Sequence, residues 1–198
     1  MIVTKKAPDF VAPAVLGDNK IVDNFQLYEN KGKNGTILFF WPKDFTFVCP
    51  SEIIAFNNRY EQFQERGFNV IGVSVDSDFV HLAWKNMDVT KGGIGNIKFP
   101  IVSDIKKEIS LSYDVLLEQG FSLRGSFLID RNNIVRHAVI NDLPLGRNID
   151  EMLRMVDALL FFEQNGDVCP ANWTKGKEGI KTTQDGINEF LSKNKDSI

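Results

Sequence analysis

The sequence predicts an α/β fold in which a central mixed β-sheet is flanked by helices, and three observations support this prediction. Short β-branched and aromatic runs alternate with segments of helical periodicity over residues 1–165, a pattern typical of α/β domains. Two pairs of these runs are separated by short, turn-rich segments, which predicts antiparallel hairpins in the same sheet. Hydrophobic residues make up 43% of the chain, which is enough for a large core.

The N-terminal part begins with a predicted hairpin and continues with a strand, a loop and a helix. Phe10–Leu16 and Lys20–Leu27 flank a three-residue turn and form the hairpin, which covers an edge of the sheet. Thr36–Trp41 is an unbroken β-branched and aromatic run, which predicts a central strand buried on both faces. Apolar residues at helical spacing between positions 53 and 63 predict a helix, and Gly67 follows it as a C-terminal cap.

The rest of this body repeats the alternation of strands and helices. In chain order we expect a strand, a helix, a strand, a helix and the two strands of a second hairpin: Asn69–Val75, Asp78–Asn86, Phe99–Val102, Ile105–Tyr113, Ser126–Ile129 and Ile134–Ile140. This hairpin makes the sheet mixed. A final helix, opened by the capping-box pair Asn148 and Glu151, runs to about Gln164, and Gly166 ends it.

Residues 166–198 differ in composition from the body formed by residues 1–165. Gly, Lys, Thr and Asn are frequent, and only Ile187, Phe190 and Leu191 form an apolar patch at helical spacing. So few apolar side chains cannot build a core of their own. We therefore expect a C-terminal arm that packs on the body or on a partner chain.

Composition and charge argue against several classes of function. The longest apolar runs are five residues, far short of the roughly 20 that a membrane-spanning helix needs. The first ten residues lack the apolar stretch of a secretory signal, so we expect a cytoplasmic protein. A net charge of −3 without a basic stripe argues against a nucleic-acid partner.

The cysteines and histidines lie too far apart in the sequence for a structural zinc site. Cys49, Cys169, His81 and His137 form no close pair, whereas zinc sites use closely spaced Cys and His ligands. The two histidines have no recognisable partner, and we expect ordinary packed or surface side chains. The two cysteines must then be explained one at a time.

Cys49 is the strongest candidate for chemistry. It follows a strand and a loop, and it lies directly before Pro50–Glu52, which open a helix. Free N–H groups and the dipole at a helix N-terminus stabilise negative charge, which favours the nucleophilic thiolate. From this position alone, the alternative that Cys49 is a small buried hydrophobic residue stays open.

Three further residues are placed to complete a site around this sulfur. Thr46 precedes Cys49 by three residues, so a tight loop would aim its hydroxyl at the sulfur, and Pro42 would shield it. Arg124 is flanked by apolar segments, where an arginine without a partner is costly. The alternatives are a turn hydroxyl bonded to its own backbone for Thr46 and a surface salt bridge for Arg124.

Two cysteine motifs resemble those of the peroxiredoxins. Pro42-x-x-x-Thr46-x-x-Cys49, within Asp44–Glu52, resembles the active-site loop of that family. Asp167–Trp173 resembles the resolving-cysteine segment of typical two-cysteine members of the alkyl hydroperoxide reductase C type. Three more segments extend the resemblance: Gly92–Gly95, Leu123–Gly125 and Asn141–Arg147.

The resemblance implies a thioredoxin-like fold and a thiol peroxidase that uses no metal, haem or flavin. Cys49 would be the peroxidatic cysteine, which attacks a hydroperoxide and becomes a sulfenic acid. Thr46 and Arg124 would hold the peroxide oxygens and stabilise the thiolate, and Pro42 would shield the sulfur. Hydrogen peroxide and organic hydroperoxides would be the substrates.

The resemblance also assigns supporting and resolving residues. Glu52 and Arg147 would orient the arginine network. Cys169 would condense with the sulfenic acid of a second subunit, which implies a homodimer with an intersubunit disulfide, assembled into a decameric ring. Thioredoxin or a flavoprotein disulfide reductase would then reduce the disulfide.

Two alternative functions on the same fold remain to be weighed. A thiol-disulfide oxidoreductase usually carries Cys-x-x-Cys, which this chain lacks. A holdase chaperone would need neither Thr46 nor Arg124. The resemblance also implies a latch against local unfolding, made of a Gly-Gly-x-Gly loop and a terminal Tyr-Phe pair, where this chain has Phe190 and Leu191.

Overall fold

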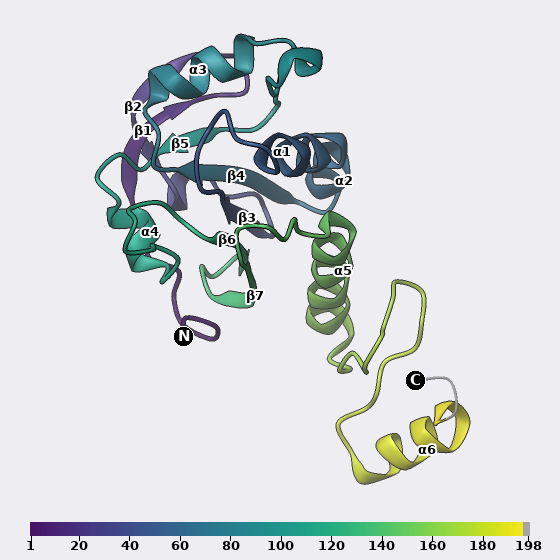
Figure 1. Ribbon diagram of the computed structural model, residues 1–198. Coiled ribbons are helices and arrows are strands. Elements are labelled where there is room, and N and C mark those ends of the chain that lie inside the picture. Colours follow the sequence, from purple (N-terminus) through teal and green to yellow (C-terminus); the bar gives the residue numbers. More distant parts are fainter. Residues whose placement is uncertain (196–198) are drawn as a thin grey trace. The chain divides into compact units, whose positions relative to one another are not determined.

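The structure, a computed structural model, describes residues 1–195 and divides into two compact units (Figure 1). The first unit is Met1–Ile149 and the second is Asp150–Ile198. The sequence predicts a boundary between residues 165 and 166, which is one helix after this division, because the composition of the chain changes only after that helix. Within the described residues, every helix is too short or too polar to cross a membrane.

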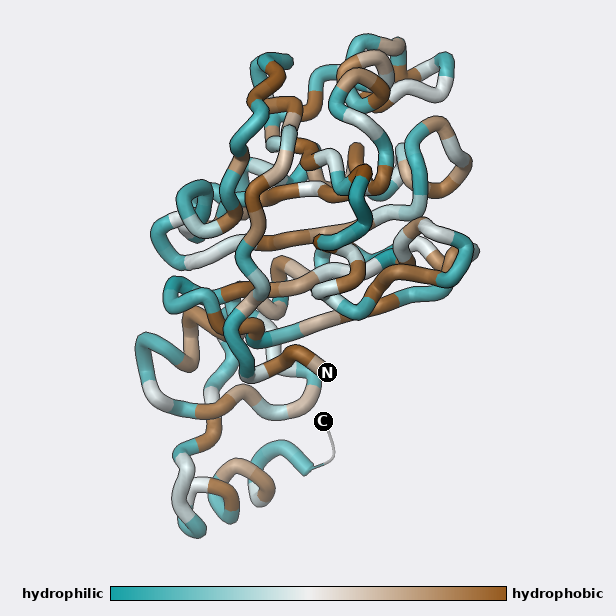
Figure 2. The backbone as a smooth tube through the Cα atoms, turned by 90° about the vertical axis from the view of Figure 1, so that its left-hand side faces the viewer, coloured by the Kyte–Doolittle hydropathy of each residue, from teal (hydrophilic) through white to brown (hydrophobic). Residues whose placement is uncertain are grey.

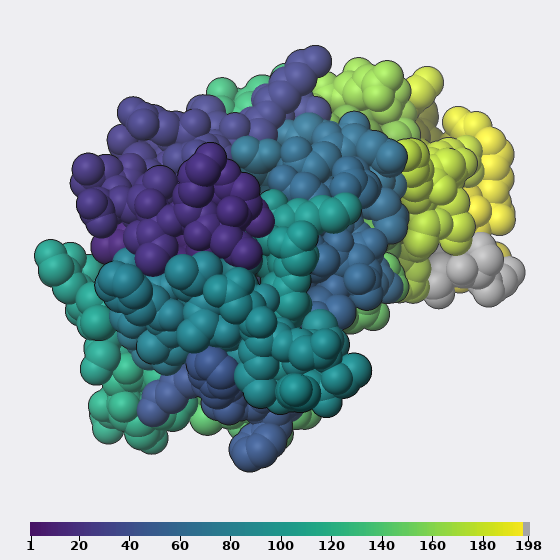
Figure 3. All heavy atoms as spheres, turned by 90° about the horizontal axis from the view of Figure 1, so that it is seen from above, coloured from purple at the N-terminus to yellow at the C-terminus, as the bar shows by residue number. Residues whose placement is uncertain are grey.

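A seven-stranded mixed sheet forms the centre of the first unit, as the sequence predicts. Its order is β2-β1-β5-β4-β3-β6-β7. The strands are β1 (Val11–Val15), β2 (Ile21–Gln26), β3 (Gly35–Phe40), β4 (Phe68–Ser74), β5 (Ile101–Ser103), β6 (Arg124–Asp130) and β7 (Val135–Asn141). Strand β3 pairs in parallel with β4 and antiparallel with β6. Strand β1 pairs antiparallel with β5, and in Figure 3 the purple N-terminal residues lie beside teal residues from the middle of the chain.

The central strand β3 is buried on both faces, as its unbroken apolar run predicts. All six of its residues are buried, and Figure 2 shows apolar residues along the central strands. On one face, Leu38 and Phe40 join a large apolar cluster with residues of β4, β5 and β6. On the other, the Phe39 ring stacks on Phe56 with centroids 4.1 Å apart. This stacking holds the following helix against the sheet.

The helices of the first unit differ in detail from the prediction. They are α1 (Cys49–Asn58), α2 (Tyr60–Glu65), α3 (Asp78–Asn86) and α4 (Glu108–Ser112). The single helix expected over positions 53–63 is two helices, because Arg59 leaves helical geometry at φ −108° and ψ 4°. Helix α4 is also shorter than expected. It begins only after Lys107, whose φ is +64°, where the Asp104 carboxylate accepts bonds from two backbone N–H groups.

The glycine-rich loop Gly92–Gly95 is hydrogen-bonded to α3 and to the short 3₁₀ helix η2 (Val89–Lys91). The Trp84 indole donates to the Gly92 carbonyl at 2.9 Å, and the Trp84 carbonyl accepts from the Ile94 N–H at 3.3 Å. Ile94 is buried. Gly92 has φ +86°, which suits a glycine.

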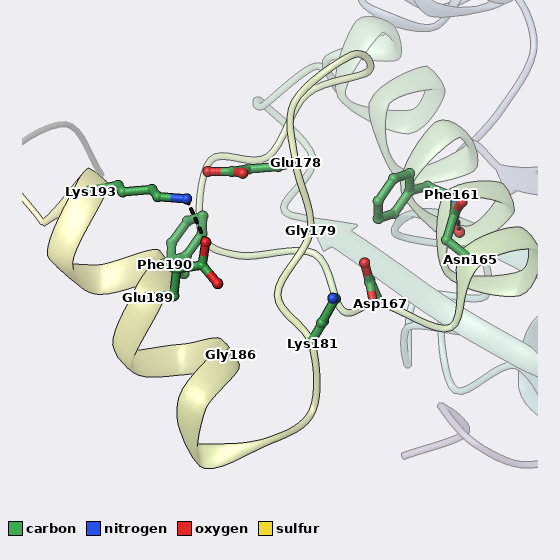
Figure 4. Close-up of a pocket in the computed structure, with 10 residues that line it drawn as sticks. All are labelled: Phe161, Asn165, Asp167, Glu178, Gly179, Lys181, Gly186, Glu189, Phe190 and Lys193. Carbon is green, nitrogen blue, oxygen red and sulfur yellow. Dashed lines mark hydrogen bonds and ion pairs between the residues drawn. The ribbon is translucent and has the colours of Figure 1, made fainter.

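The second unit consists of α5 (Ile149–Asn165), the arm and α6 (Gln184–Asn194). The arm packs on α5 through Trp173, whose ring lies 4.9 Å from that of Phe161 and whose carbonyl accepts from Arg154 Nη1 at 2.7 Å. Figure 4 shows the pocket between these segments, with an ion pair of 2.6 Å between Glu189 and Lys193 on α6. The arm is therefore organised by α5, as its small apolar content predicts.

Candidate active site

Cys49 is the first residue of α1 and its side chain is fully buried. The prediction placed the helix start directly after it, whereas the structure includes Cys49 in the first turn with Val48 as N-cap. Val48 supplies no side-chain cap, and Pro50 occupies the first turn, where it lacks an N–H to satisfy. The sulfur therefore lies at the positive end of a helix dipole.

The Thr46 hydroxyl contacts both the Cys49 sulfur and a backbone carbonyl of its own turn, the two alternatives that the sequence left open. Its Oγ1 lies 2.9 Å from the Cys49 sulfur and 2.9 Å from the Lys43 carbonyl oxygen. A hydroxyl has one proton to donate, and an anionic sulfur accepts it more strongly than a neutral carbonyl does. The preceding residue, Phe45, has φ +55°, so the loop turns sharply just before the threonine.

Arg124 approaches the same sulfur from the sheet. It is the first residue of β6 and is buried, so the alternative of a surface salt bridge is wrong. Its Nη1 donates to the Cys49 sulfur at 3.3 Å and to Glu52 Oε2 at 2.7 Å, while Nε donates to the Leu143 carbonyl at 2.7 Å. Three bonds fix the guanidinium plane and aim one nitrogen at the sulfur.

Glu52 and Arg147 complete a buried ionic cluster beneath the sulfur. Arg147 Nε donates to Glu52 Oε1 at 2.7 Å and Nη2 donates to Oε2 at 3.0 Å, a two-pronged pairing. Arg147 Nη1 also donates to the Gly125 carbonyl at 2.6 Å and to Ser126 Oγ at 3.0 Å. The sequence-predicted arginine network is thus brought together from α1, β6 and the loop before α5.

The charges of this cluster balance only when the sulfur is negative. Two guanidinium groups face one carboxylate, so Arg124, Arg147 and Glu52 carry a net charge of +1. Burial alone would raise the pKa of Glu52, but its hydrogen bonds with Arg147 outweigh burial and lower that pKa. Burial opposes the charge on Arg124, but its bonds to Cys49 and Glu52 win and raise its pKa. A thiolate at Cys49 restores neutrality.

None of the hydrogen bonds described above involves Pro42 or Cys169. Pro42 follows the end of β3 and is buried at the start of the active-site loop. Cys169 belongs to the second unit, where its sulfur lies 3.5 Å from the Ala158 carbonyl oxygen. Burial raises the pKa of the Cys169 thiol, and the charge of Arg154 offsets part of that rise. Both cysteines are free thiols.

The sequence indicated no partner for His81, and on this point the prediction was wrong, because the structure shows one. His81 is fully buried on α3, and its Nδ1 lies 2.7 Å from Asp44 Oδ2 on the active-site loop. The two residues are 37 positions apart, so no local pattern links them. The only sequence signal is a carboxylate at position 44 beside the apolar Trp41. Among residues 1–195, no three metal-binding side chains of His, Cys, Asp or Glu lie together.

Comparison with known proteins identifies the family. Residues 3–138 match the AhpC/TSA family, and residues 158–193 match the C-terminal domain of 1-Cys peroxiredoxin. Alkyl hydroperoxide reductase C of Helicobacter pylori strain 26695 is 67% identical over 194 residues, 98% of each chain. The mitochondrial thioredoxin-dependent peroxide reductase of Drosophila melanogaster is 48% identical, covering 96% of this chain and 82% of the relative.

A solved structure gives the same answer at the level of the fold. The crystal structure of reduced 2-Cys peroxiredoxin from Plasmodium vivax matches with a TM-score of 0.94 and 49% identity, covering 97% of this chain and 99% of that one. The chain belongs to the AhpC/TSA family. The predicted thioredoxin-like fold and the resemblance to two-cysteine peroxiredoxins are confirmed. Its activity is that of a thiol peroxidase, an oxidoreductase with an antioxidant function.

Proposed function

We propose that Cys49 is the peroxidatic cysteine of this thiol peroxidase and that hydrogen peroxide and organic hydroperoxides are its substrates. The observation that carries the proposal is the convergence of Thr46 Oγ1 and Arg124 Nη1 on one buried sulfur, at 2.9 and 3.3 Å. Donors aimed at a single sulfur stabilise its anion and can also bind the oxygens of an incoming peroxide.

The first step consumes one thiolate and one hydroperoxide. The Cys49 thiolate attacks the terminal peroxide oxygen, the O–O bond breaks, and the electron pair leaves on the other oxygen, the one that carries the organic group or, in hydrogen peroxide, a hydrogen. That oxygen takes a proton and departs as water or an alcohol, and the sulfur becomes a sulfenic acid. Thr46 and Arg124 act here because they bind charge as it develops across the breaking bond.

Pro42, Glu52 and Arg147 have supporting roles in this proposal. Glu52 accepts from the Arg124 guanidinium at 2.7 Å, and Arg147 holds Glu52 through bonds of 2.7 and 3.0 Å, which keeps Arg124 aimed at the sulfur during the reaction. Pro42 shields the sulfur, because its ring is buried where the loop leaves β3. A peroxide-oxidation rate measured by stopped flow tests the assignment: Thr46→Val and Arg124→Met should each slow Cys49 oxidation, whereas Thr46→Ser should not.

Cys169 resolves the sulfenic acid in the second step. Its thiolate attacks the oxidised sulfur, the S–O bond breaks, and a disulfide forms, while the departing hydroxide takes a proton and leaves as water. We propose that the two sulfurs belong to different subunits. A homodimer is supported by β7, which lies at the edge of the sheet and can pair with a second chain.

Assembly of dimers into a decameric ring is the further part of this proposal. Phe47 and Phe79 are 99% and 71% exposed, and exposed large apolar side chains mark protein contact sites. A non-reducing denaturing gel tests the dimer: oxidised protein should run as a dimer and, after dithiothreitol, as a monomer. Mass spectrometry that finds only an intrachain Cys49–Cys169 link would contradict it. Sedimentation velocity of the reduced protein measures the ring.

The electron donor and the location follow from the need to reduce this disulfide. The Drosophila relative is named thioredoxin-dependent, and we propose thioredoxin or a flavoprotein disulfide reductase as donor for this chain. NAD(P)H oxidation with each donor separates the two. A cytoplasmic location fits a supply of dithiol reductant, and cell fractionation tests it.

We also propose that residues 1–165 form the peroxidase domain and that residues 166–198 form the resolving arm. A chain ending at residue 165 should therefore react once with peroxide.

A further inference from the structure

A buried polar pair holds the active-site loop from below, and the mechanism described above does not use it. Asp44 lies between Pro42 and Thr46 in that loop, and its side chain is fully buried. Its Oδ1 accepts from Trp41 Nε1 at 2.9 Å, and its Oδ2 lies 2.7 Å from His81 Nδ1. One carboxylate therefore bridges the start of the loop and helix α3.

The other ring nitrogen of His81 fixes where its protons lie. His81 Nε2 is 3.2 Å from the carbonyl oxygen of Val102 on β5. A carbonyl oxygen can only accept, so Nε2 carries a hydrogen. The 2.7 Å contact between Nδ1 and Asp44 needs one more hydrogen, because two facing lone pairs in a dry interior are costly.

That second hydrogen makes the pair neutral wherever it resides. On Nδ1 it gives an imidazolium facing a carboxylate, and on Oδ2 it gives a neutral imidazole facing a carboxylic acid. Burial raises the pKa of Asp44, with Asp76 adding to the rise and His81 opposing it. Asp76 faces the pair from the turn after β4, where its Oδ2 accepts from the Asp44 N–H at 2.8 Å. The proton on the pair is therefore a structural element.

The loop turns sharply between this pair and the reacting sulfur. Phe45, the next residue, has φ +55°, a conformation that bulky side chains seldom adopt without support. Phe45 is 52% exposed and its ring lies 5.7 Å from that of Trp84, so packing supplies only part of that support. Thr46 follows directly, and the position of its hydroxyl depends on how the backbone turns at residues 44 and 45.

We propose that Asp44 and His81 are positioning residues of the peroxidase reaction, which share a proton to hold the loop so that the Thr46 hydroxyl meets the Cys49 sulfur. The proposal rests on the proposed role of Cys49. Neither Asp44 nor His81 touches the sulfur or a substrate. They act through Thr46, and their effect on the reaction is bounded by the effect of removing the Thr46 hydroxyl.

Two histidine variants form a matched pair for the test. In His81→Asn the side-chain nitrogen takes the place of Nδ1, so it keeps the bond to Asp44 and loses the bond to Val102. In His81→Gln the nitrogen takes the place of Nε2, so it keeps the bond to Val102 and loses the bond to Asp44. Asp44→Asn is the conservative variant, because its amide oxygen can accept from Trp41 and its amide nitrogen can donate to neutral His81.

The measurement is the second-order rate constant for sulfenic acid formation on Cys49 in full-length Cys169→Ser protein mixed with hydrogen peroxide. His81→Gln should lower this constant about tenfold, the cost of a lost charge-assisted hydrogen bond. His81→Asn and Asp44→Asn should stay close to the unaltered protein. Asp44→Ser, too short to bridge Trp41 and His81 together, is a second disrupting variant if His81→Gln does not fold.

A double-mutant cycle separates positioning from general damage. If the pair acts through Thr46, His81→Gln should slow the reaction about tenfold alone, but should add nothing in a Thr46→Val background. An equal loss in both backgrounds, or a disrupting variant that folds and reacts at the full rate, would overturn the proposal. No sulfenic acid on Cys49 in the Cys169→Ser parent protein would instead refute the proposed function itself.

Discussion

The two cysteines occupy opposite chemical environments, one in each unit of the chain. The Cys49 sulfur meets a hydroxyl and a guanidinium within 3.3 Å, and both groups donate hydrogen bonds. The Cys169 sulfur lies 3.5 Å from a backbone carbonyl, which only accepts. Donors stabilise a sulfur anion, whereas a carbonyl favours the protonated thiol.

This contrast fits the two different roles that we propose for one side-chain type in one chain. At Cys49 the surrounding cluster carries a net positive charge that only a thiolate neutralises. At Cys169 burial raises the thiol pKa, which suits the proposed resolving role, in which the thiol waits until a sulfenic acid is available. The difference comes from the neighbours that the fold supplies, because the two residues are chemically identical.

The largest expected effect comes from removing each sulfur in turn. Cys49→Ser should abolish peroxidase activity, because the thiolate is the nucleophile. Cys169→Ser should still allow one rapid oxidation of Cys49 but no disulfide. Single-turnover kinetics with dimedone trapping of the sulfenic acid measure both results. Full turnover of Cys49→Ser with a thioredoxin-type reductant would contradict the division of roles.

A smaller effect, on the free energy of unfolding, is expected when one carboxylate is removed from the ionic cluster of each unit. Glu52→Gln leaves two buried guanidinium groups without their carboxylate, which should lower the free energy of unfolding by about 3–5 kcal/mol. Its matched control is Glu151→Gln in the second unit, where the Glu151–Arg154 pair at 2.6 Å is partly exposed. That variant should cost only about 0–1 kcal/mol. Urea unfolding at pH 7 measures both.

The Glu52 effect should also depend on pH in a defined direction. The fold lowers the pKa of Glu52 below its ordinary value of 4.5, so its stabilisation is complete above that value. As the pH falls through the lower, folded-state pKa, the folded carboxylate is protonated and this stabilisation is lost. The stability difference between Glu52→Gln and the unaltered protein should therefore shrink in acid. A difference that stays constant down to pH 3 would exclude Glu52 as its source.

The sequence predicted the parts of this site that are close together in the chain. Thr46 and Cys49 are three residues apart on one loop, so their contact follows from local geometry. Arg147 and Glu52 are 95 residues apart, and their grouping came from a family resemblance. The Asp44–His81 pair lies outside both kinds of signal, because only the packing of α3 against β5 and the loop brings it together.

The same limit explains the errors in the secondary structure. The run of strand β3 is a local property, and its burial on both faces was predicted. The break at Arg59 has no glycine or proline to mark it. The late start of α4 depends on the Asp104 side chain, which caps N–H groups five and six residues away. Helical periodicity records the apolar face, and it does not record such caps.

The smallest expected effect concerns the competition between disulfide formation and overoxidation. Cys49 is fully buried in the first turn of α1, so the proposed disulfide with Cys169 requires that turn to open first. While it stays closed, a second peroxide can oxidise the sulfenic acid to the sulfinic form. The peroxiredoxin resemblance implies a latch that slows this opening. Its glycine loop is present here, but Phe190 and Leu191 replace the Tyr-Phe pair.

The altered latch predicts intermediate sensitivity to overoxidation. Phe190 is buried in the second unit at 9% exposure, whereas Leu191 is 43% exposed. Phe190→Tyr adds a hydroxyl whose hydrogen bond is worth about 1 kcal/mol, so it should shift the closed-to-open ratio and the sulfinic yield roughly fivefold upward. Truncation after Asn188 should lower the yield, and truncation after Ser192, which keeps Phe190 and Leu191, should not. Mass spectrometry of Cys49 during peroxide titration measures the yield, and equal values in full-length and Asn188-truncated protein would show that the terminal helix does not control opening.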